Sequence, residues 1–435
     1  MTNPVHLVIN GQPVRAESDW SVLEAAKHNG VKIPHFCYLE GVHQIGSCRI
    51  CVVEVEGMRS LQASCTIPVR DGMIVKTNTA RVKKAREVLY ELMLSDHPRN
   101  CLSCYRNQNC EFQKLGEEIK IPDCRFEGER SKDFVDASSP SVYRDTSKCI
   151  LCRRCVTVCS EIQGVGVLGV NHRGFGTTIG PAADLPLGSS NCANCGQCVM
   201  VCPVGALLTR VDSRPVWNAL FNPKVRTVVQ TAPAVRVALG EMFGMEPGTI
   251  VTAKMAHALR LLGFDDVFDT NFAADLTILE EGTEFLNRAL AAVRGQDVVL
   301  PMITSCSPGW IKYVEHEFPH RLAHLSSCKS PHMMLGALAK TYWAKKKAVD
   351  PKEMYVVSVM PCTAKKFEIT RPELFVDGLP AVDAVLTTRE LARMIKEAGI
   401  DFNSLEGMAF DEPLGFSTGA ADIFATPKAT LDFIE

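Results

Sequence analysis

The chain has 435 residues, of which 46% are hydrophobic and 22% charged, and its formal net charge is −2. This composition is typical of a folded, soluble protein of about two to four domains, and the small net charge excludes nucleic acid and an anionic membrane as main partners. No apolar run reaches about 18 residues, so no transmembrane helix is expected. The N-terminus "MTNPVHLVING" lacks a signal-peptide pattern, and we expect a cytoplasmic protein.

Residues 1–80 begin with the pattern of a small β-grasp domain. Two alternating runs are joined by Asn10-Gly11, which predicts a β-hairpin. Ser21 and Glu24 then form a capping box for a helix, and Gly30 ends that helix. A strand–strand–helix order followed by a cysteine-bearing loop favours the β-grasp fold.

Cysteine is the unusual residue of this sequence, with 19 copies that fall in runs. In a reducing compartment, clustered thiols indicate metal or iron–sulfur ligands rather than disulfides. The first set has the spacing C-x10-C-x2-C-x13-C and comprises Cys37, Cys48, Cys51 and Cys65. Two ligands close together and two distant ones can enclose a 2Fe–2S cluster, for which a zinc site is the alternative.

Residues 81–135 are predicted to form a small His/Cys cluster domain. Its helix over 81–95 has one apolar packing face, made of Val82, Ala85, Leu89, Leu92 and Met93. An H-x3-C-x2-C-x5-C run follows, made of His97, Cys101, Cys104 and Cys110. Three cysteines leave a 4Fe–4S cluster one ligand short, and we expect His97 to be the fourth. The alternative is a surface histidine at the helix end, where its charge suits the helix dipole.

Residues 136–212 carry the strongest pattern, a C-x2-C-x2-C-x3-C run that occurs twice. The two runs are Cys149, Cys152, Cys155 and Cys159, then Cys192, Cys195, Cys198 and Cys202. In two-cluster ferredoxins the fourth cysteine of each run binds the cluster of the other run. We therefore expect one 4Fe–4S site at Cys149, Cys152, Cys155 and Cys202, and another at Cys192, Cys195, Cys198 and Cys159. Four clusters in series indicate electron transfer, and the remaining Cys124 is predicted to be an inert packed thiol.

From residue 220 the sequence alternates apolar strands with helices, which predicts an α/β domain over 220–435. The apolar run "VVLPMI" is expected to be a strand that ends near Cys306, and Pro308-Gly309 to form a turn after it. The predicted fold class is therefore α+β multi-domain, with three cluster-binding domains followed by an α/β domain.

Two motifs in this second half suggest a family. "TSCSPGW" at 304–310 and "MPCTAKKFE" at 360–368 resemble the first two signatures of iron-only (FeFe) hydrogenases, TSCCPxW and MPCxxKxxE. "LEEGTEF" at 279–285 and "LSSCKSP" at 325–331 also resemble hydrogenase segments. The first 210 residues are similar to the accessory region of these enzymes, and also to iron–sulfur subunits of respiratory complex I and of formate dehydrogenases.

The resemblance implies an H-cluster, in which a 4Fe–4S cubane is joined to a two-iron unit with CO and cyanide. On the matching positions, Cys362 is a cubane ligand, Lys365 donates to a cyanide and Met360 packs on the two-iron unit. The implied proton path comprises Cys306, Glu281, Glu284 and Ser326, with Glu368 beside it. From the sequence pattern alone, Glu281 and Glu284 would be placed on a solvated helix face and Lys365 on the surface.

The first departure from the family pattern is Ser307, which stands where a cubane-ligating cysteine is usual. A serine oxygen is a poor replacement for a soft thiolate on iron. We expect Cys328 to donate the missing thiolate, and the alternative is that Cys306 changes from relay to ligand. The serine variant is most like the NAD(P)-linked, multi-subunit hydrogenases, including electron-bifurcating ones.

The second departure is the third signature, ExMxCxxGCxxGGG, which the printed sequence lacks. "GFSTGAADIF" resembles its lead-in, but "ATPKATLDFIE" follows. We therefore expect an incomplete hydrogenase domain that cannot hold a complete H-cluster as printed. Either the parent protein is a hydrogenase shown in part, or this form only transfers electrons.

The resemblance implies a cytoplasmic hydrogenase subunit that acts on H2 and protons. Since no dinucleotide-binding fingerprint is found, its expected partners are a flavin- and NAD(P)-binding subunit and a small 2Fe–2S subunit, with ferredoxin as a further candidate. The alternative is an electron-transfer subunit of the complex I or formate dehydrogenase kind, against which the paired hydrogenase motifs argue. A third reading is a sensory or maturation relative, against which the retained Cys306 argues.

Overall fold

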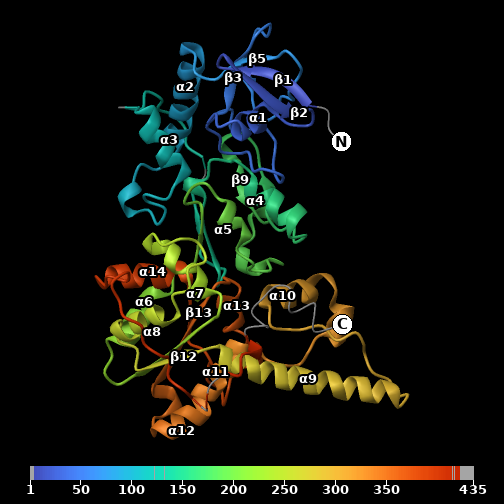
Figure 1. The fold of residues 1–435 in the computed structure, drawn as a ribbon, viewed down its shortest axis with the longest axis vertical. Coiled ribbons are helices and arrows are strands. Elements are labelled where there is room, and N and C mark those ends of the chain that lie inside the picture. The colour runs from blue at the N-terminus through green and yellow to red at the C-terminus, as the bar shows by residue number, and fades with distance from the viewer. Residues whose placement is uncertain (1–3, 122, 132, 414, 416, 422–435) are drawn as a thin grey trace. The chain divides into compact units, whose positions relative to one another are not determined.

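The computed structural model describes residues 4–121, 123–131, 133–413, 415 and 417–421. The chain divides into two compact units, the first made of residues 1–190 and 197–208 and the second of residues 191–196 and 209–435 (Figure 1). Among the described residues, no helix has the length and apolar character needed to cross a membrane.

The first unit begins with a five-stranded mixed sheet of order β2-β1-β5-β3-β4. Its elements are β1 (Pro4–Ile9), β2 (Gln12–Glu17), α1 (Val22–His28), β3 (Val52–Val55), β4 (Gln62–Ala63) and β5 (Ile74–Lys76). β1 pairs antiparallel with β2 and parallel with β5. Asn10 and Gly11 both have positive φ, 52° and 83°, so the predicted two-residue hairpin is confirmed.

The start and end of α1 follow from local sequence. The Glu24 N–H donates to Ser21 Oγ, and the Ser21 N–H donates to Glu24 Oε2 at 2.6 Å, which confirms the capping box. Gly30 has a φ of 74° just after the helix and ends it, as predicted. The buried face of α1 packs into the apolar core of the sheet.

The predicted helix over 81–95 is confirmed as α2 (Ala80–Asp96), but its predicted packing face is partly wrong. Val82 is buried, whereas Leu92 is 47% exposed and Tyr90 is buried instead. Tyr90 stacks on Phe112 of α3 (Glu111–Ile119) with ring centroids 4.5 Å apart. Because α3 covers a face that the periodicity of α2 alone does not reveal, the sequence pattern misplaced the contact.

The rest of the first unit is built from short elements joined by loops. A three-stranded sheet has the order β10-β7-β6, and β8 pairs only with β9 among the described strands. The elements are η1 (Cys101–Ser103), β6 (Val135–Asp136), β7 (Val142–Asp145), η2 (Thr146–Lys148), α4 (Arg154–Thr157), η3 (Val158–Ile162), β8 (Gly169–Asn171), η4 (Gly174–Gly176), β9 (Thr178–Gly180), η5 (Ala182–Asp184), η6 (Leu187–Ser189), α5 (Gln197–Val201) and β10 (Leu207–Thr209).

The second unit is built on a parallel four-stranded sheet of order β12-β11-β13-β14. Its strands are β11 (Arg226–Thr231), β12 (Asp266–Asp269), β13 (Met354–Met360) and β14 (Ala384–Thr387). The strands are largely buried, and the largest apolar cluster of this unit surrounds them. The predicted α/β texture of this half is therefore confirmed. β12 pairs with the outer side of β11, and β14 with the outer side of β13, so the strand order reverses between β11 and β13. In open α/β sheets, ligands bind at such a reversal, beyond the carboxyl ends of the strands.

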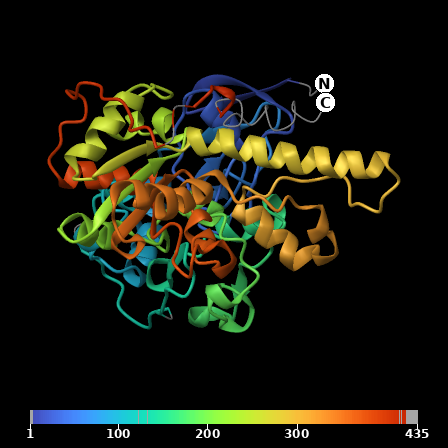
Figure 2. The ribbon, with the colours of Figure 1, turned by 90° about the horizontal axis from the view of Figure 1, so that it is seen from below.

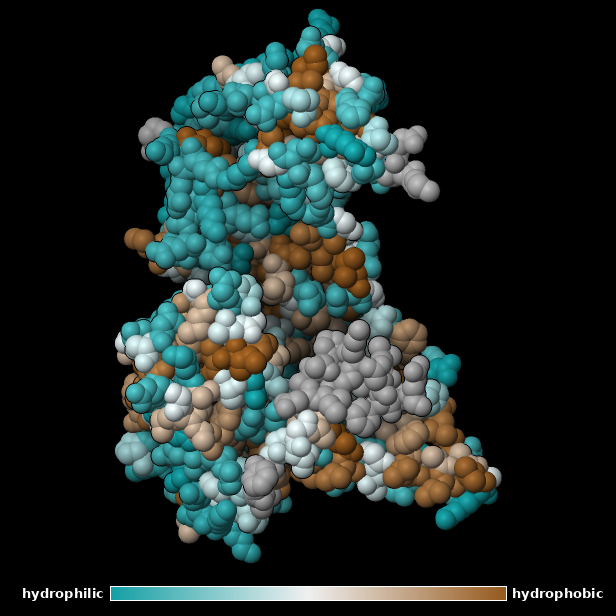
Figure 3. All heavy atoms as spheres, viewed as in Figure 1, coloured by the Kyte–Doolittle hydropathy of each residue, from teal (hydrophilic) through white to brown (hydrophobic). Residues whose placement is uncertain are grey.

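The helices of the second unit flank this sheet. They are α6 (Ser213–Leu220), α7 (Val235–Ala238), η7 (Gly240–Phe243), α8 (Thr252–Leu261), α9 (Asn271–Val293), α10 (Pro308–Glu317), η8 (Pro319–His324), α11 (Pro331–Leu338), η9 (Ala339–Trp343), α12 (Ala344–Lys347), η10 (Pro351–Glu353), α13 (Lys365–Glu368), η11 (Pro372–Leu374) and α14 (Thr388–Glu397). The long helix α9 extends beyond the sheet of its own unit (Figures 1 and 2). Its outer part exposes large apolar side chains (Figure 3), namely Leu279, Phe285, Leu286, Leu290 and Val293.

Two expectations around Cys306 are wrong. The run "VVLPMI" is no strand, and its last residue, Ile303, makes only an isolated bridge to Leu325. Pro308 and Gly309 do not form a turn but begin α10, with Ser307 as the N-cap. Proline suits the first helical position because its missing N–H would have no partner there.

Candidate iron–sulfur sites and candidate active site

The first thiol set lies in the loops beside the mixed sheet. Cys37, Cys48, Cys51 and Cys65 are all buried. The Cys51 and Cys65 sulfurs are 3.4 Å apart, and the Cys37 N–H lies 3.5 Å from the Cys48 sulfur. Four buried thiols without disulfides are the donor set that a 2Fe–2S cluster requires.

A cavity of about 360 Å³ is lined by all four residues of the second set, His97, Cys101, Cys104 and Cys110. Burial lowers the pKa of His97 to about 4, so the imidazole is neutral. Its Nδ1 is buried and has no hydrogen-bond partner among the described residues. A neutral ring with a free buried nitrogen can bind a metal, whereas a charged surface histidine would face water.

The third set is brought to one cavity as well, lined by Cys149, Cys152, Cys155 and Cys202. Burial raises the pKa of Cys149 and of Cys152 to about 12. Protonated thiols have to lose their protons to bind iron, so metal binding by these thiols would be coupled to proton release. The cavity wall includes Cys202, the fourth cysteine of the second run, but not Cys159, the fourth cysteine of the first run.

The fourth set falls on both sides of the division between the units. Cys192 and Cys195 belong to the second unit, and Cys198 and Cys159 to the first. Within the second unit, Thr363 Oγ1 donates to the Asn194 carbonyl at 3.0 Å. Gly196 has a φ of 73°, and a Cβ there would collide with the Thr363 side chain. The loop of Cys192 and Cys195 therefore packs directly against the loop that follows Cys362.

Hydrogen bonds from two adjacent residues, which sequence reasoning missed, connect two cysteine sets of the first unit. The buried His43 donates from Nε2 to the Cys152 carbonyl at 3.1 Å, and its Nδ1 accepts from the Thr157 hydroxyl. The next residue, Gln44, donates to the carbonyl of Cys65. One dipeptide thus links the backbone of a cysteine in the first set to that of a cysteine in the third. No spacing signal marks it, because both partners are distant in sequence.

The candidate active site lies beyond the carboxyl end of β13. Met360 is the buried last residue of that strand, and Cys362 follows it half-buried. Lys365 Nζ donates to the Cys306 carbonyl at 2.7 Å and pairs with Glu368 Oε2 at 2.7 Å. Lys365 is therefore turned inward and is not a surface residue.

Glu368 is bound on its other side by His332, which sequence reasoning did not single out. The His332 Nε2 lies 2.6 Å from Glu368 Oε2, and Nδ1 lies 3.1 Å from Ser358 Oγ. Burial alone would raise the pKa of Glu368, but Lys365 and His332 outweigh it and lower this pKa to about 2. Burial lowers the pKa of His332, so a neutral imidazole donates to an ionised carboxylate.

The carboxylates of α9 lie beside the Cys306 loop. Glu281 is buried, and burial raises its pKa despite a hydrogen bond with the Ser326 hydroxyl and one from the Ser305 N–H. The Ser326 hydroxyl donates its proton to Glu284 Oε2 at 2.9 Å. Hydrogen bonds from Ser326, the Ser327 N–H and Arg288 outweigh burial and lower the pKa of Glu284. Glu281 is thus not on a solvated helix face, and the two carboxyl groups differ in proton affinity.

Cys328 lies next to the same residues. Its sulfur is 3.8 Å from Glu284 Oε2, and its carbonyl accepts from Ser305 Oγ at 2.8 Å. Burial raises the pKa of its thiol and that of Cys306. Cys328 therefore lies beside the loop in which Ser307 replaces the usual cysteine. The segment "ATPKATLDFIE", where the family signature was expected, lies outside the described residues.

Cysteines that gather in sets, one of them beside a neutral histidine, are typical of an iron–sulfur oxidoreductase. Residues 225–432 match the family model "Iron only hydrogenase large subunit, C-terminal domain". Residues 2–80 match a 2Fe-2S iron-sulfur cluster binding domain, 86–125 an NADH-ubiquinone oxidoreductase-G iron-sulfur binding region and 139–208 an NADH-quinone oxidoreductase subunit 3 ferredoxin-like domain. Together with the relatives that follow, these matches show that the chain belongs to the iron-only hydrogenase family.

Two relatives align with nearly the whole chain. The NADP-reducing hydrogenase subunit HndD of Solidesulfovibrio fructosivorans is 49% identical over 432 residues, which are 98% of this chain and 74% of the relative. Iron hydrogenase 1 of Clostridium pasteurianum is 39% identical over 428 residues, again 98% and 74%. A solved apo form of the [FeFe]-hydrogenase HydA1 from Chlamydomonas reinhardtii is 44% identical with a TM-score of 0.45, over 48% of this chain and 53% of that one.

Proposed function

We propose that this protein is the hydrogen-activating subunit of a multi-subunit FeFe hydrogenase. It catalyses reversible H2 oxidation and passes electrons along its accessory clusters to or from an NAD(P)- and flavin-binding partner. The observation that carries the proposal is the hydrogen bond between Thr363 and the Asn194 carbonyl. It joins the loop of the last accessory thiols, Cys192 and Cys195, to the loop of Cys362, so an electron has a short covalent and hydrogen-bonded route between them.

The accessory sites are proposed to hold one 2Fe–2S and three 4Fe–4S clusters in the ligand sets described above. A β-grasp domain over 1–80, a His/Cys domain over 81–135 and a two-cluster ferredoxin domain over 136–212 would carry them. The protein's own contribution to electron flow is to bridge neighbouring sets. His43 and Gln44 connect the first and third sets, and Arg106 donates to the Cys202 carbonyl at 2.9 Å from the wall of the His97 cavity.

The hydrogenase domain over 220–435 is proposed to contribute Cys362 as one ligand of the H-cluster, with Met360 packing beside it. When bound, this group supplies the cleavage of H2 into two protons and two electrons. Lys365 offers a charged donor to an anionic ligand, and its aim is fixed by Glu368 and the Cys306 carbonyl. Met360 and Glu368 are buried, whereas Lys365 and Cys362 are partly exposed.

The proton route is proposed to run from Cys306 to Glu281, across Ser326, and out through Glu284. The raised pKa of Glu281 lets this buried carboxyl accept a proton from the Cys306 side. The Ser326 hydroxyl is hydrogen-bonded to both carboxyl groups and can accept and donate in turn. Glu284 is held by Arg288 at 2.6 Å nearer the surface, where its lower pKa favours release to water.

The ligand lost at Ser307 is proposed to be replaced by Cys328, with Cys306 as the alternative. The hydrogen bond from Ser305 to the Cys328 carbonyl supports the first choice, because it keeps Cys328 beside the Ser307 loop. Cys328→Ala should then lower cubane iron content and the matching EPR signal. Full cubane occupancy in that variant would transfer the role to Cys306.

The proposed partners are a flavin- and NAD(P)-binding subunit and a small 2Fe–2S subunit, with ferredoxin as a further electron partner. The cysteines fall in runs with iron–sulfur spacing rather than in a disulfide framework, which supports a cytoplasmic location where thiols stay reduced.

Infrared spectroscopy and H2-dependent dye reduction test the proposal on the complete, maturase-treated gene product. Bands of bound CO and cyanide together with dye reduction under H2 are expected. A protein with full accessory clusters but neither bands nor dye reduction would instead be an electron-transfer subunit of the complex I kind.

A further inference from the structure

Arg144 places a buried positive charge at one of the proposed cluster sites. This residue of β7 is 2% exposed, and it lines the cavity together with Cys149, Cys152, Cys155 and Cys202. Its Nε atom is buried and has no hydrogen-bond partner among the described residues. A guanidinium cannot lose its proton in a protein, so this charge is permanent.

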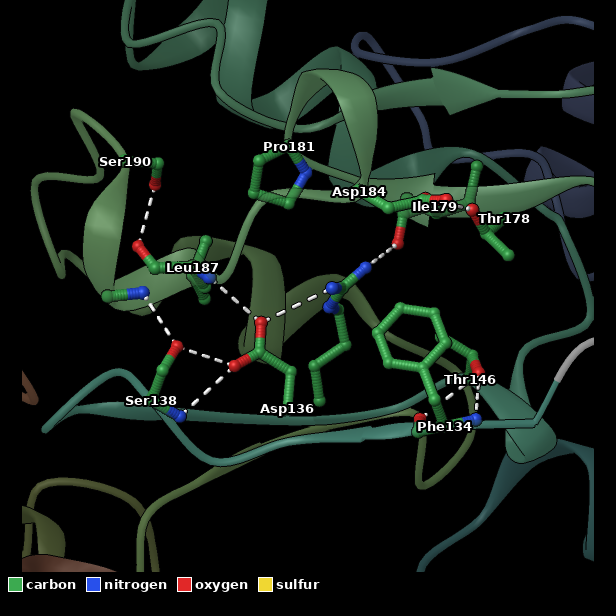
Figure 4. A network of polar contacts seen from close by, with 12 residues as sticks. Phe134, Asp136, Ser138, Thr146, Thr178, Ile179, Pro181, Asp184, Leu187 and Ser190 are labelled. Carbon is green, nitrogen blue, oxygen red and sulfur yellow. Dashed lines mark hydrogen bonds and ion pairs between the residues drawn. The ribbon is translucent and has the colours of Figure 1, made fainter.

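The surrounding network holds the guanidinium in place. Nη1 donates to the Ile179 carbonyl at 2.7 Å, and Nη2 pairs with Asp136 Oδ2 at 3.2 Å. Asp136 itself is held by the Leu187 N–H and by Ser138, as Figure 4 shows. The guanidinium also lies 4.6 Å from the centre of the Phe134 ring.

The glycine at position 180 leaves room for the Arg144 side chain. A Cβ at Gly180, in β9, would overlap the guanidinium of Arg144. A close-packed interior offers a side chain few alternative positions, so the Arg144 guanidinium stays on the cavity wall.

Other charged groups around the cavity do not cancel this one. Asp136 is not on the cavity wall, so the ion pair turns its positive end toward the thiols. Asp145 lines the wall, but Lys148 neutralises it at 2.8 Å. The remaining charge on the wall, Arg153, is exposed and therefore screened by water.

We infer that Arg144 raises the reduction potential of the iron–sulfur group held by Cys149, Cys152, Cys155 and Cys202. Reduction adds one electron from a donor and makes the site one unit more negative, which a buried cation favours. No proton is taken up, because Arg144 keeps its charge in both states. The inference rests on the proposed cluster ligands. It means that this site has a higher reduction potential than it would have without Arg144 and is more easily reduced.

Arg106 offers a comparison with a different expected pattern. It lines the His97 cavity and also donates to the Cys202 carbonyl at 2.9 Å. Its charge therefore acts on two sets, whereas that of Arg144 acts mainly on one.

The test is a redox titration of the iron-loaded protein, followed by EPR with dithionite as the electron donor. The signal of this site is the one that Cys152→Ser removes. Arg144→Gln should shift the midpoint of that signal to a more negative potential, and Arg144→Lys should leave it closer to the wild-type value. Arg106→Gln should move this midpoint and that of the His97 site, while the exposed control Arg81→Gln moves neither.

A second variant covers instability of the first. Arg144→Gln leaves Asp136 buried and unpaired, so the double variant Asp136→Asn with Arg144→Gln removes both charges and keeps hydrogen-bonding groups. It should also shift the midpoint to a more negative value. An unchanged midpoint potential would overturn the inference about Arg144 but not the proposed cluster. A midpoint potential in Arg144→Lys as low as in Arg144→Gln would do the same. If Cys152→Ser removes no signal from the iron-loaded protein, the proposed cluster itself is wrong and the inference falls with it.

Discussion

His332 and Glu368 form a buried pair whose Nε2 and Oε2 atoms lie 2.6 Å apart. Lys365 shares the same carboxylate oxygen at 2.7 Å and donates onward to the Cys306 carbonyl. His332 therefore fixes, through Glu368, the lysine that holds the Cys306 loop. It is a positioning residue for the candidate active site.

Removing this imidazole should loosen the site. His332→Ala leaves Glu368 and the Ser358 hydroxyl without one of their buried partners, and we expect the free energy of unfolding to fall by about 1–3 kcal/mol. His332→Gln is the matched control, because its amide can still donate to Glu368. Anaerobic urea unfolding measures the difference. An alanine variant as stable as the wild type would contradict the positioning role.

The same pair should make stability depend on pH. Burial lowers the pKa of His332 below 6.5, and Lys365 with His332 lowers that of Glu368 to about 2. Since the unfolded chain then binds more protons, this stability is complete above about pH 6.5 and is lost as pH falls below it. Urea unfolding between about pH 8 and pH 5 should show this loss, with a smaller slope in His332→Gln. Equal slopes in both proteins would contradict it.

Gly196 tests the contact between the Cys195 loop and Thr363. Gly196→Ala combines a strained φ of 73° with a collision against Thr363, which should displace its hydroxyl from the Asn194 carbonyl. Gly295 has the same φ of 73° but no atom within 4 Å, so Gly295→Ala carries the strain alone. Electron delivery from H2 to an external dye should slow in the first variant and stay near wild type in the second. Equal rates in the two variants would show that the contact is not part of the route.

Lys366 holds α13 to its surroundings through buried charges. Its Nζ lies 2.7 Å from Asp212 Oδ2 and 3.1 Å from Glu390 Oε2. Lys366→Met leaves both carboxylates unpaired, which should cost about 3–5 kcal/mol of unfolding free energy. The exposed Lys345→Met should change stability by about 0.5 kcal/mol or less. Thermal unfolding of both variants gives the comparison, and a small effect at Lys366 would mean that water enters the site.

Local chemistry explains which expectations succeeded. The Asn10-Gly11 hairpin and the Ser21–Glu24 capping box depend on residues within a few positions, so the sequence alone predicts them. The grouping of Cys149, Cys152 and Cys155 follows from spacing in the same way. Their common cavity with Cys202 agrees with ferredoxin spacing, while iron binding there stays a prediction.

Long-range partners explain what was missed. His332 meets Glu368 across 36 positions and Arg144 meets Ile179 across 35, so neither forms a pattern in the sequence. The strand and turn expected around Cys306 were wrong because apolar runs and Pro-Gly pairs also suit a loop and a helix start. The exposed Leu92 shows the same limit, since the later helix α3 decides which face of α2 is covered.

The parallel pairing of β11 with β13 joins residue 226 to residue 354. On the ribosome, at roughly 5–20 residues per second, β11 therefore waits on the order of ten seconds for its central neighbour. Throughout that interval its N–H and C=O groups form an open strand edge, which invites mispairing with another nascent chain. The β1–β5 pair of the first unit is complete once residue 76 is made, so the sheet beside the first cysteine set can form while the central pair of the second unit still lacks β13.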